Sequence, residues 1–269
     1  MIEKIFILLI GISPNIKKTL WRFWYQFLAN SYQKTDWQFM NYGFYDLNSE
    51  LSSLNLAPED ENNYYSINLY HYVASVTQIK NKQVLEVGCG RGGGSAYVAK
   101  YLQPQKIIGI DFSEQNIKLA QKFYHLSNLS FVQGDAENLP FENDTFDVIL
   151  NVESSHCYGS MSKFLAEVYR VLKPSGIFSW ADLRPINEVE NLKENFAQSG
   201  LKQIKTAIIT PNVLKSLELV DKSKKNVIKN YVPTFFQGVF QEFAGVKNSQ
   251  IYNAFETGEM VYLSYVFQK

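Results

Sequence analysis

The chain has 269 residues, of which 46% are hydrophobic, and can bury a full core as one α/β domain with appended helices. Lysine plus arginine and aspartate plus glutamate number 26 each, and no basic run of the kind that tracks phosphates is present, so a nucleic-acid partner is disfavoured. Cys89 and Cys157 are the only cysteines, which indicates a reducing compartment, and we expect a cytoplasmic location.

The N-terminus permits two interpretations. The apolar run 6–12 is too short to span a membrane and no small-residue cleavage site follows it, which disfavours a signal peptide. Residues 17–25 are basic and aromatic. The segment either packs as a helix on the domain or on a partner subunit, which leaves a homodimer open, or makes weak contact with a membrane surface. We favour the packed helix.

Residues 1–80 are expected to form a helical N-terminal extension that also serves as a lid. Within it, 41–46 reads as a turn that carries two tyrosines, and the polar stretch 58–63 reads as a loop. Residues 81–269 are then expected to form the core, with an insertion at about 211–257 as a second lid.

A glycine-rich turn after an apolar run is the most informative part of the chain. The run 84–87 suits a buried parallel strand, and Gly88 and Gly90 let the backbone turn sharply beside a ligand before a helix opens at Ser95. Glu86 precedes the glycines, which gives E-x-G-x-G-x-G and not the dinucleotide form G-x-G-x-x-G. With no Tyr-x-x-x-Lys set either, a nicotinamide-dependent dehydrogenase is disfavoured.

Polar residues follow the next strands at regular spacing. Asp111 ends a strand at 107–111, about twenty residues beyond the glycines, where a carboxylate can accept hydrogen bonds from both ribose hydroxyls. Asp135 follows the strand that begins at Leu129 and is placed to accept from an adenine amino group. Two further strands end in polar residues and are predicted at 146–151, ending in Asn151, and at 176–182, ending in Asp182.

The rest of the chain predicts a helical insertion between two strands. A helix at 188–199 ends before Gly200, a sixth strand spans 203–210, and a long helical region runs from Pro211 to about Asn253. The last strand is expected at 260–267. The insertion would lie above the shared edge of these two strands, a natural place for a lid.

Three segments carry a resemblance to a known family. Residues 85–90 (LEVGCG), 134–141 (GDAENLPF) and 171–176 (VLKPSG) resemble, in order and separation, the class I S-adenosylmethionine-dependent methyltransferases. The third segment usually ends Pro-Gly-Gly, and Pro-Ser-Gly here changes only a turn. The resemblance implies an α/β fold with a Rossmann-like seven-stranded sheet, mostly parallel with the last strand antiparallel, and helical lids at both ends. It also implies S-adenosyl-L-methionine as the cofactor.

Within that family the chain is similar to natural-product and lipid O-methyltransferases of the phthiotriol dimycocerosate methyltransferase type. This similarity rests on residues 41–44, 91–94, 151–158, 181–185 and 258–260. It implies an O-methyltransferase acting on a hydroxyl of a small hydrophobic molecule, such as a polyketide, a peptide-polyketide or a lipid-like metabolite. The residues expected at the cofactor are Glu86, Gly88, Gly90, Asp111, Gly134, Asp135, Ala136, Asn151 and Tyr42.

Deprotonation of a hydroxyl requires a base, and His156 is the candidate. It follows the fourth predicted strand, and Asp182 ends the neighbouring one, so the carboxylate can fix the imidazole tautomer while the other ring nitrogen takes the proton. Related O-methyltransferases carry a His and an Asp at these places. A structural role is the alternative for a single histidine. His71 is more readily explained by a hydrogen bond in the lid, and His125 by the surface.

An aromatic face of the predicted helical insertion bears on the nature of the acceptor. Five large apolar residues recur at helical spacing between residues 235 and 243, which suits either a hydrophobic acceptor pocket or ordinary packing of the lid. Carbon or nitrogen methylation on the same scaffold and a non-catalytic cofactor-binding protein are the remaining alternatives. Three scattered histidines offer no ligand cluster, so no metal is expected.

Overall fold

A seven-stranded sheet in the order β3-β2-β1-β4-β5-β7-β6 forms the centre of the molecule. The computed structural model describes residues 37–49 and 54–269. β7 runs antiparallel to both β5 and β6, and the other pairings are parallel, as the family resemblance implied. The strands are β1 (Gln83–Val87), β2 (Lys106–Asp111), β3 (Leu129–Gln133), β4 (Phe146–Val152), β5 (Leu172–Pro185), β6 (Lys202–Ile208) and β7 (Met260–Gln268).

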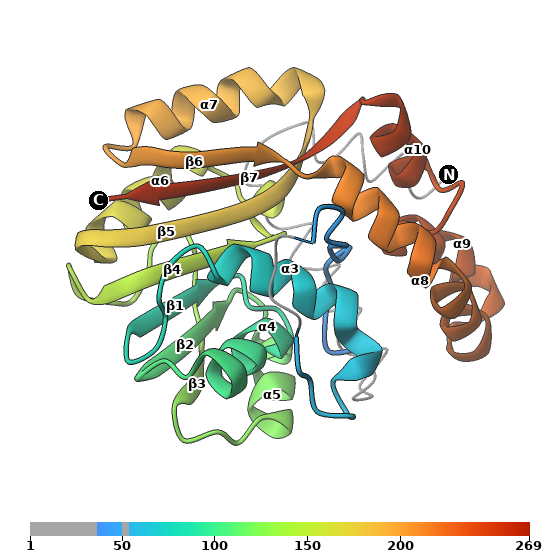
Figure 1. Cartoon of the computed structure of the whole chain (residues 1–269), viewed down its shortest axis with the longest axis horizontal. Coiled ribbons are helices and arrows are strands. Elements are labelled where there is room, and N and C mark those ends of the chain that lie inside the picture. The colour runs from blue at the N-terminus through green and yellow to red at the C-terminus, as the bar shows by residue number, and fades with distance from the viewer. Residues whose placement is uncertain (1–36, 50–53) are drawn as a thin grey trace.

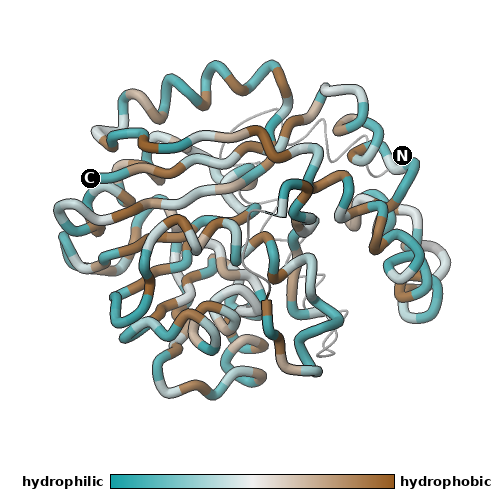
Figure 2. Tube along the Cα trace, in the orientation of Figure 1, coloured by the Kyte–Doolittle hydropathy of each residue, from teal (hydrophilic) through white to brown (hydrophobic). Residues whose placement is uncertain are grey.

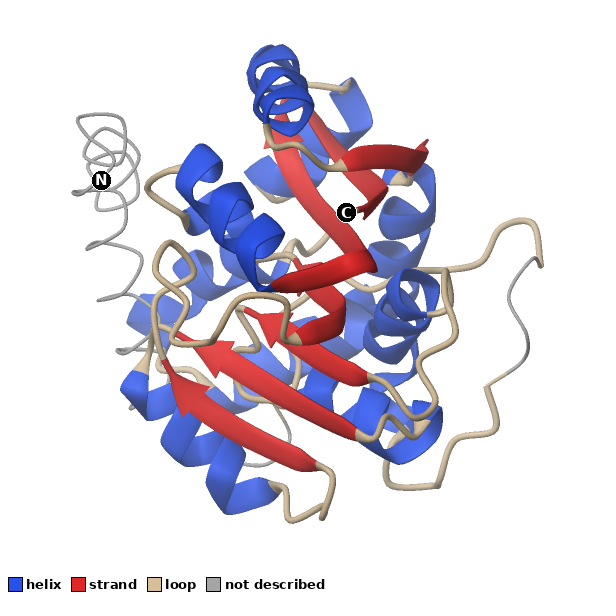
Figure 3. Ribbon diagram, turned by 90° about the vertical axis from the view of Figure 1, so that its left-hand side faces the viewer, coloured by secondary structure: helices blue, strands red, loops and turns tan. Residues whose placement is uncertain are grey.

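Helices cover both faces of this sheet (Figure 3). Short 3-10 or π turns accompany them at Glu61–Asn63, Val98–Leu102, Ser155–Cys157 and Ile186–Glu188. The α-helices of the described residues are α3 (Tyr64–Ala74), α4 (Gly93–Tyr97), α5 (Glu114–Phe123), α6 (Met161–Val171), α7 (Val189–Gln198), α8 (Thr210–Tyr231), α9 (Thr234–Ala244) and α10 (Gln250–Thr257).

The alternation of side chains along each strand builds two separate cores. Val84 of β1 belongs to the core that also contains residues of α3, α8 and α10, whereas its neighbour Leu85 belongs to the core on the opposite face, with residues of α6 and α7. Apolar stretches therefore run along the strands, while the helices alternate between apolar and polar residues (Figure 2). Both layers are sealed by fully buried aromatic side chains, among them Trp180 on one face and Tyr262 on the other.

The predicted strands are present, and β5 and β6 differ from the prediction at their ends. β5 continues past the predicted end at Asp182 to Pro185. β6 stops at Ile208 because α8 already begins at Thr210, and Pro211 has the fixed φ that suits the first turn of a helix. β5 begins at Leu172, before the predicted turn. Its pairing with β4 jumps from Leu172 to Ile177, so the turn interrupts the ladder, and within it Ser175 has φ +63°, a left-handed conformation that glycine adopts more easily.

The helical insertion between β6 and β7 is present as α8, α9 and α10. In Figure 1 these helices and the segment 37–49 lie beyond the carboxyl ends of β4 and β5. Of the predicted helical extension 1–80, the described part is helical only in α3 and the short turn before it. The apolar run 6–12 and the basic aromatic stretch 17–25 lie outside the described residues.

The segment around Tyr42 is bound to two helices. The N–H of Phe44 donates to the carbonyl of Tyr65 in α3 at 2.9 Å, and the N–H of Tyr45 donates to the carbonyl of Asn212 in α8 at 3.1 Å. The hydroxyl of Ser216 donates to the carbonyl of Tyr42 at 3.0 Å. These bonds hold the segment between α3 and α8.

Candidate active site

A cavity of about 990 Å³, its open mouth included, lies at the carboxyl ends of β1 to β4. We call it the strand-end cavity. This edge is where open α/β sheets bind ligands, because β1 lies between strands whose connections run in opposite directions along the sheet. Six of the residues expected at the cofactor line it: Gly88, Gly90, Asp111, Gly134, Asp135 and Ala136.

The glycine turn needs its glycines for shape. Gly88 and Gly90 have φ values of +78° and +53°, which side chains with a Cβ rarely adopt. A Cβ on Gly88 would also collide with the side chain of Ser154. The N–H of Gly90 donates to Oδ2 of Asp111 at 2.9 Å, so the turn and the end of β2 hold each other in place.

Asp111 is pre-oriented at the floor of this cavity. Its Oδ1 accepts the N–H of Ser113 at 2.9 Å, and burial raises the pKa of the carboxyl group above its ordinary value. Asp135 accepts the N–H of Glu137 at 3.0 Å through its own Oδ1. Two carboxylates thus line the cavity at adjacent strand ends, as a ribose and an adenine amino group would require.

Two other expected cofactor residues lie outside the lining. Glu86 is fully buried beneath the cavity, where it accepts hydrogen bonds from Tyr70 at 2.7 Å and from Ser95, and burial raises its pKa to about 7. The amide of Asn151 donates to the carbonyl of Val87 at 2.9 Å and to the Ser154 hydroxyl at 2.8 Å. Both residues support the walls, since Tyr70 and Ser154 do line the cavity.

Tyr42, the third, faces a second cavity. Its ring packs edge-on against Phe255 at 5.9 Å, and Nζ of Lys224 lies 5.7 Å from the ring centroid. Its backbone approaches the strand-end cavity, because its N–H donates to Oε2 of Glu153 at 2.9 Å. The side chain of Tyr42 therefore lines the second cavity, whereas its backbone N–H contacts a residue of the first.

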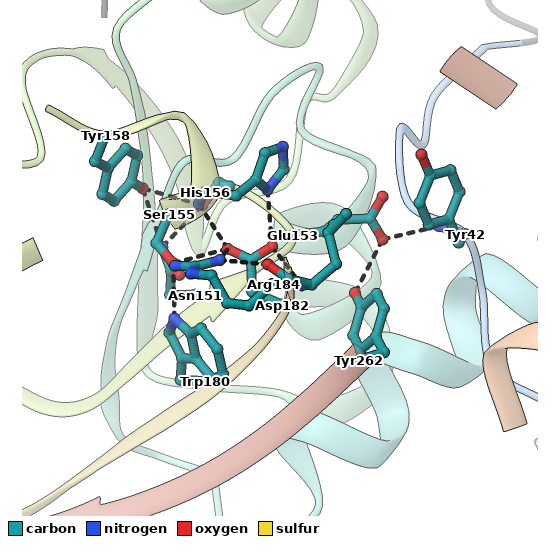
Figure 4. A network of polar contacts seen from close by, with 12 residues as sticks. Tyr42, Asn151, Glu153, Ser155, His156, Tyr158, Trp180, Asp182, Arg184 and Tyr262 are labelled. Carbon is teal, nitrogen blue, oxygen red and sulfur yellow. Dashed lines mark hydrogen bonds and ion pairs between the residues drawn. The ribbon is translucent and has the colours of Figure 1, made fainter. Parts of the chain in front are cut away.

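His156 and Asp182 are in direct contact (Figure 4). Nδ1 of His156 lies 2.8 Å from Oδ1 of Asp182, and the N–H of His156 donates to Oδ2 at 2.9 Å. The pairing that the sequence predicted is therefore present. His156 does not line the strand-end cavity itself, but its neighbours Glu153 and Cys157 do, which places the dyad at the wall of the cavity.

A buried network holds Asp182 in position. Oδ2 also accepts the hydroxyl of Ser155 at 2.7 Å, and Arg184 lies 3.1 Å from the same oxygen. Arg184 and Trp180 both donate to the Ser155 hydroxyl, at 2.7 Å and 2.8 Å. The Asp182 side chain is completely buried, so these partners offset its desolvation.

The electrostatics of the site favour a protonated His156 and an ionised Asp182. Burial lowers the pKa of His156, but the neighbouring Cys157 and Asp182 raise it, with a net increase to about 10. Burial raises the pKa of Asp182, and the charges of His156 and Arg184 overcome that effect and lower it well below the usual range. We attribute the increase at His156 mainly to Asp182, because its buried carboxylate lies 2.8 Å from Nδ1.

The second cavity has an apolar, aromatic lining and a volume of about 1210 Å³, its opening included. We call it the aromatic cavity. Phe240 and Phe243 of the predicted aromatic face line it, and the Trp37 ring packs against them at 6.0 Å and 6.4 Å. It shares three wall residues with the strand-end cavity: Phe39, Met40 and Asn41.

The remaining candidates are structural. His71 binds the Tyr97 hydroxyl at 2.8 Å and Ser75 at 3.0 Å, which agrees with the predicted hydrogen-bonding role, and His125 is exposed. Among residues 37–49 and 54–269, no cluster of three His, Cys, Asp or Glu is arranged to hold a metal ion. Within the same part of the chain, no helix combines the length and the apolar character needed to cross a bilayer.

Sequence reasoning missed three residues of this network. Glu153 precedes the predicted base His156 by three residues. Its hydrogen bonds, however, reach Tyr42 and Tyr262, each more than one hundred residues away along the chain. Ser155 and Arg184 belong to segments used for the family resemblance, but nothing in their spacing showed that both contact Asp182. Only the spacing of Arg184, two residues after Asp182 and so on the same face of one strand, could have suggested an ion pair.

Comparison with known proteins identifies close relatives. Residues 85–180 match the family model described as a methyltransferase domain. A phthiotriol/phenolphthiotriol dimycocerosates methyltransferase of Mycobacterium leprae is 39% identical over 96% of this chain and 94% of its own length. A fatty-acid O-methyltransferase of Mycolicibacterium smegmatis is 33% identical over 91% and 88%. The fold matches a putative sarcosine dimethylglycine methyltransferase from Galdieria sulphuraria with TM-score 0.69 and 15% identity, covering 86% and 93% of the two chains.

Proposed function

The chain belongs to the class I S-adenosylmethionine-dependent methyltransferases, and from this premise we propose that it methylates an oxygen of a hydrophobic, lipid-like or polyketide-like metabolite. The observation that carries the proposal is the wall shared by the strand-end cavity and the aromatic cavity, together with the position of the His156–Asp182 pair at the wall of the strand-end cavity. This arrangement brings a cofactor site, a basic group and an apolar acceptor site together.

The strand-end cavity fits the cofactor chemically. Asp111 and Asp135 offer carboxylate oxygens where a ribose and an adenine need acceptors, and the turn at Gly88 leaves no Cβ in the space. When bound, S-adenosylmethionine supplies an electrophilic methyl group on a positively charged sulfur. The residues expected to hold it in place are Gly88, Gly90, Asp111, Gly134, Asp135 and Ala136.

The dyad would handle the proton of the acceptor hydroxyl. A neutral imidazole with its proton on Nδ1, donated to Asp182, carries a lone pair on Nε2 that would take the proton of the acceptor hydroxyl. Asp182 would then stabilise the imidazolium that forms. Positioning of the acceptor oxygen in line with the methyl group supplies the larger part of the acceleration.

The aromatic cavity supports an apolar acceptor. Aromatic and aliphatic side chains make up most of its lining, as is typical of sites that bind an apolar body. The named activities of the relatives, on phthiotriol dimycocerosates and on fatty acids, agree with a long hydrocarbon body bearing one reactive oxygen.

Mass spectrometry of product mixtures tests the proposal. The purified chain, given S-adenosylmethionine and a panel of long-chain diols, hydroxylated polyketides and fatty acids, should add one methyl group to an oxygen of one class. Short polar alcohols, amines and diphosphates are the matched controls. Transfer to a carbon or nitrogen, or to the short polar acceptors alone, would contradict it.

A further inference from the structure

Glu153 occupies an unusual position directly after β4. Its φ of +47° is left-handed, although it is not a glycine, and its N–H donates to the carbonyl of Ala181 in β5 at 2.8 Å. This backbone conformation directs the side chain into the wall of the strand-end cavity. Residues in such conformations are retained where the surrounding structure imposes them, often at functional sites.

The carboxylate is held by donors from two distant elements. Oε2 accepts the N–H of Tyr42 and the hydroxyl of Tyr262 in β7, both at 2.9 Å (Figure 4). Burial raises the pKa of Glu153 to about 7, while these two hydrogen bonds and the charge of His156 favour its ionised form. A carboxylate is thus kept at a position where its charge is costly.

The surroundings of the cavity are predominantly acidic. Its described lining contains four carboxylates, those of Asp111, Asp135, Glu137 and Glu153, and one guanidinium, that of Arg91. Asp111 and Asp135 lie at the ends of β2 and β3, on the side expected for ribose and adenine. Glu153 lies on the opposite side, at the end of β4, next to the residues that separate the two cavities.

We infer that Glu153 selects the positively charged methyl donor over the uncharged thioether product. The inference rests on the family's cofactor and not on the proposed acceptor. A carboxylate in the cavity wall attracts a sulfonium, and the attraction disappears when the sulfur is a neutral thioether. The same residue therefore favours donor binding and product release.

Lys224 provides an opposing charge on the other side. It lines the aromatic cavity, donates to the carbonyl of Ala244 at 2.9 Å, and interacts electrostatically with Glu153, while burial lowers its pKa to about 8. Its ammonium must weaken the negative potential that Glu153 creates in the strand-end cavity. Removing the charge of Glu153 should lower the preference for the donor over the product, and removing the charge of Lys224 should raise it.

The test is calorimetric binding of S-adenosylmethionine and S-adenosylhomocysteine to folded variants. Glu153→Gln keeps the shape and can still accept a hydrogen bond, and should lower the ratio of donor to product affinity by about tenfold. Lys224→Met should raise that ratio. Glu137→Gln, which removes a carboxylate on the adenine side of the same cavity, should change the ratio far less.

A purely structural role for Glu153 gives different results. Loss of both affinities by the same factor in Glu153→Gln, or an unchanged ratio, would overturn the inference. Tyr262→Phe removes one of the two hydrogen bonds that favour the ionised form of Glu153, so it should lower the ratio less than Glu153→Gln does. If Glu153→Gln does not fold, Glu153→Met and Glu153→Asp replace it, and only the variant without a charge should lose the selectivity.

Discussion

Nδ1 of His156 and Oδ1 of Asp182 lie 2.8 Å apart, and the backbone N–H of the same histidine donates to the other oxygen of that carboxylate at 2.9 Å. Asp182 therefore fixes both the ring and the peptide of His156. This double attachment leaves the imidazole little rotational freedom, so its second nitrogen is held in a single direction.

Removal of the imidazole should affect turnover and not cofactor binding. We expect His156→Ala to lower kcat by roughly 10²–10⁴-fold, the usual contribution of a positioned general base, with the affinity for S-adenosylmethionine unchanged. His125→Ala is the matched control, because His125 is exposed. Steady-state kinetics with near wild-type turnover in His156→Ala would eliminate the dyad as the base.

Asp182→Asn should lower kcat less than His156→Ala but also destabilise the fold. Arg184 is 5% exposed and would lose its buried carboxylate partner, for which a loss on the order of 3 kcal/mol is typical. Urea unfolding of the two variants should separate them, with the larger decrease in unfolding free energy in Asp182→Asn. Equal unfolding free energies of Asp182→Asn and the wild type would mean that the Asp182–Arg184 ion pair does not contribute to stability.

The pH dependence should follow the raised pKa of His156. The base must be neutral, so kcat/KM should rise with pH above the ordinary histidine value of 6.5, toward about 10. Because the folded chain binds this proton more tightly than the unfolded chain, the stability contributed by His156 is complete below pH 6.5 and is lost as pH rises toward 10. Histidine NMR should show His156 titrating above 6.5 and His71, whose pKa burial lowers, titrating below it.

Asp111 should determine cofactor affinity. A ribose-binding carboxylate makes two charge-assisted hydrogen bonds, and we expect Asp111→Ala to weaken S-adenosylmethionine and S-adenosylhomocysteine by about 2–4 kcal/mol. Asp147→Ala is the control, since Asp147 accepts the N–H of Gln83 at the opposite ends of β4 and β1. Calorimetry that finds equal affinity in the wild type and Asp111→Ala would remove the ribose assignment.

The lid hypothesis predicts local protection on binding. Hydrogen exchange of residues 37–45 and of α8 to α10 should slow when S-adenosylmethionine binds, while the central strands β1 and β4 stay unchanged. Identical exchange of the lid segments with and without the cofactor would reduce the aromatic face to ordinary packing.

The sequence predicted the position of the candidate site on the sheet better than the orientation of the individual side chains. The ends of β1 and β2 could be predicted because their apolar runs stop at Gly88 and Asp111, at the same edge of the sheet. The end of β5 could not, since this strand continues past Asp182 to Pro185. The alternation along β1 also places Glu86 on the face of Val84, beneath α3, and away from the face of Leu85. Its partners on α3 and α4 depend on tertiary packing.

Contacts between residues far apart in the sequence could not be predicted, for a different reason. Glu153 binds Tyr262 only because β7 inserts antiparallel between β5 and β6, and this register pairs Leu183 with Tyr262. The left-handed backbone of Glu153 has no signature in a sequence, since glycine and asparagine are the residues that mark such positions.

The backbone of one residue links the two cavities. The N–H of Tyr42 donates to Glu153 at the strand-end cavity, and its carbonyl accepts from Ser216 of α8, beside the aromatic cavity. A change at either cavity that moves Tyr42 must therefore affect the other. By thermodynamic linkage, cofactor and acceptor would then alter each other's affinity by one common factor, so the order in which they bind carries no energetic advantage.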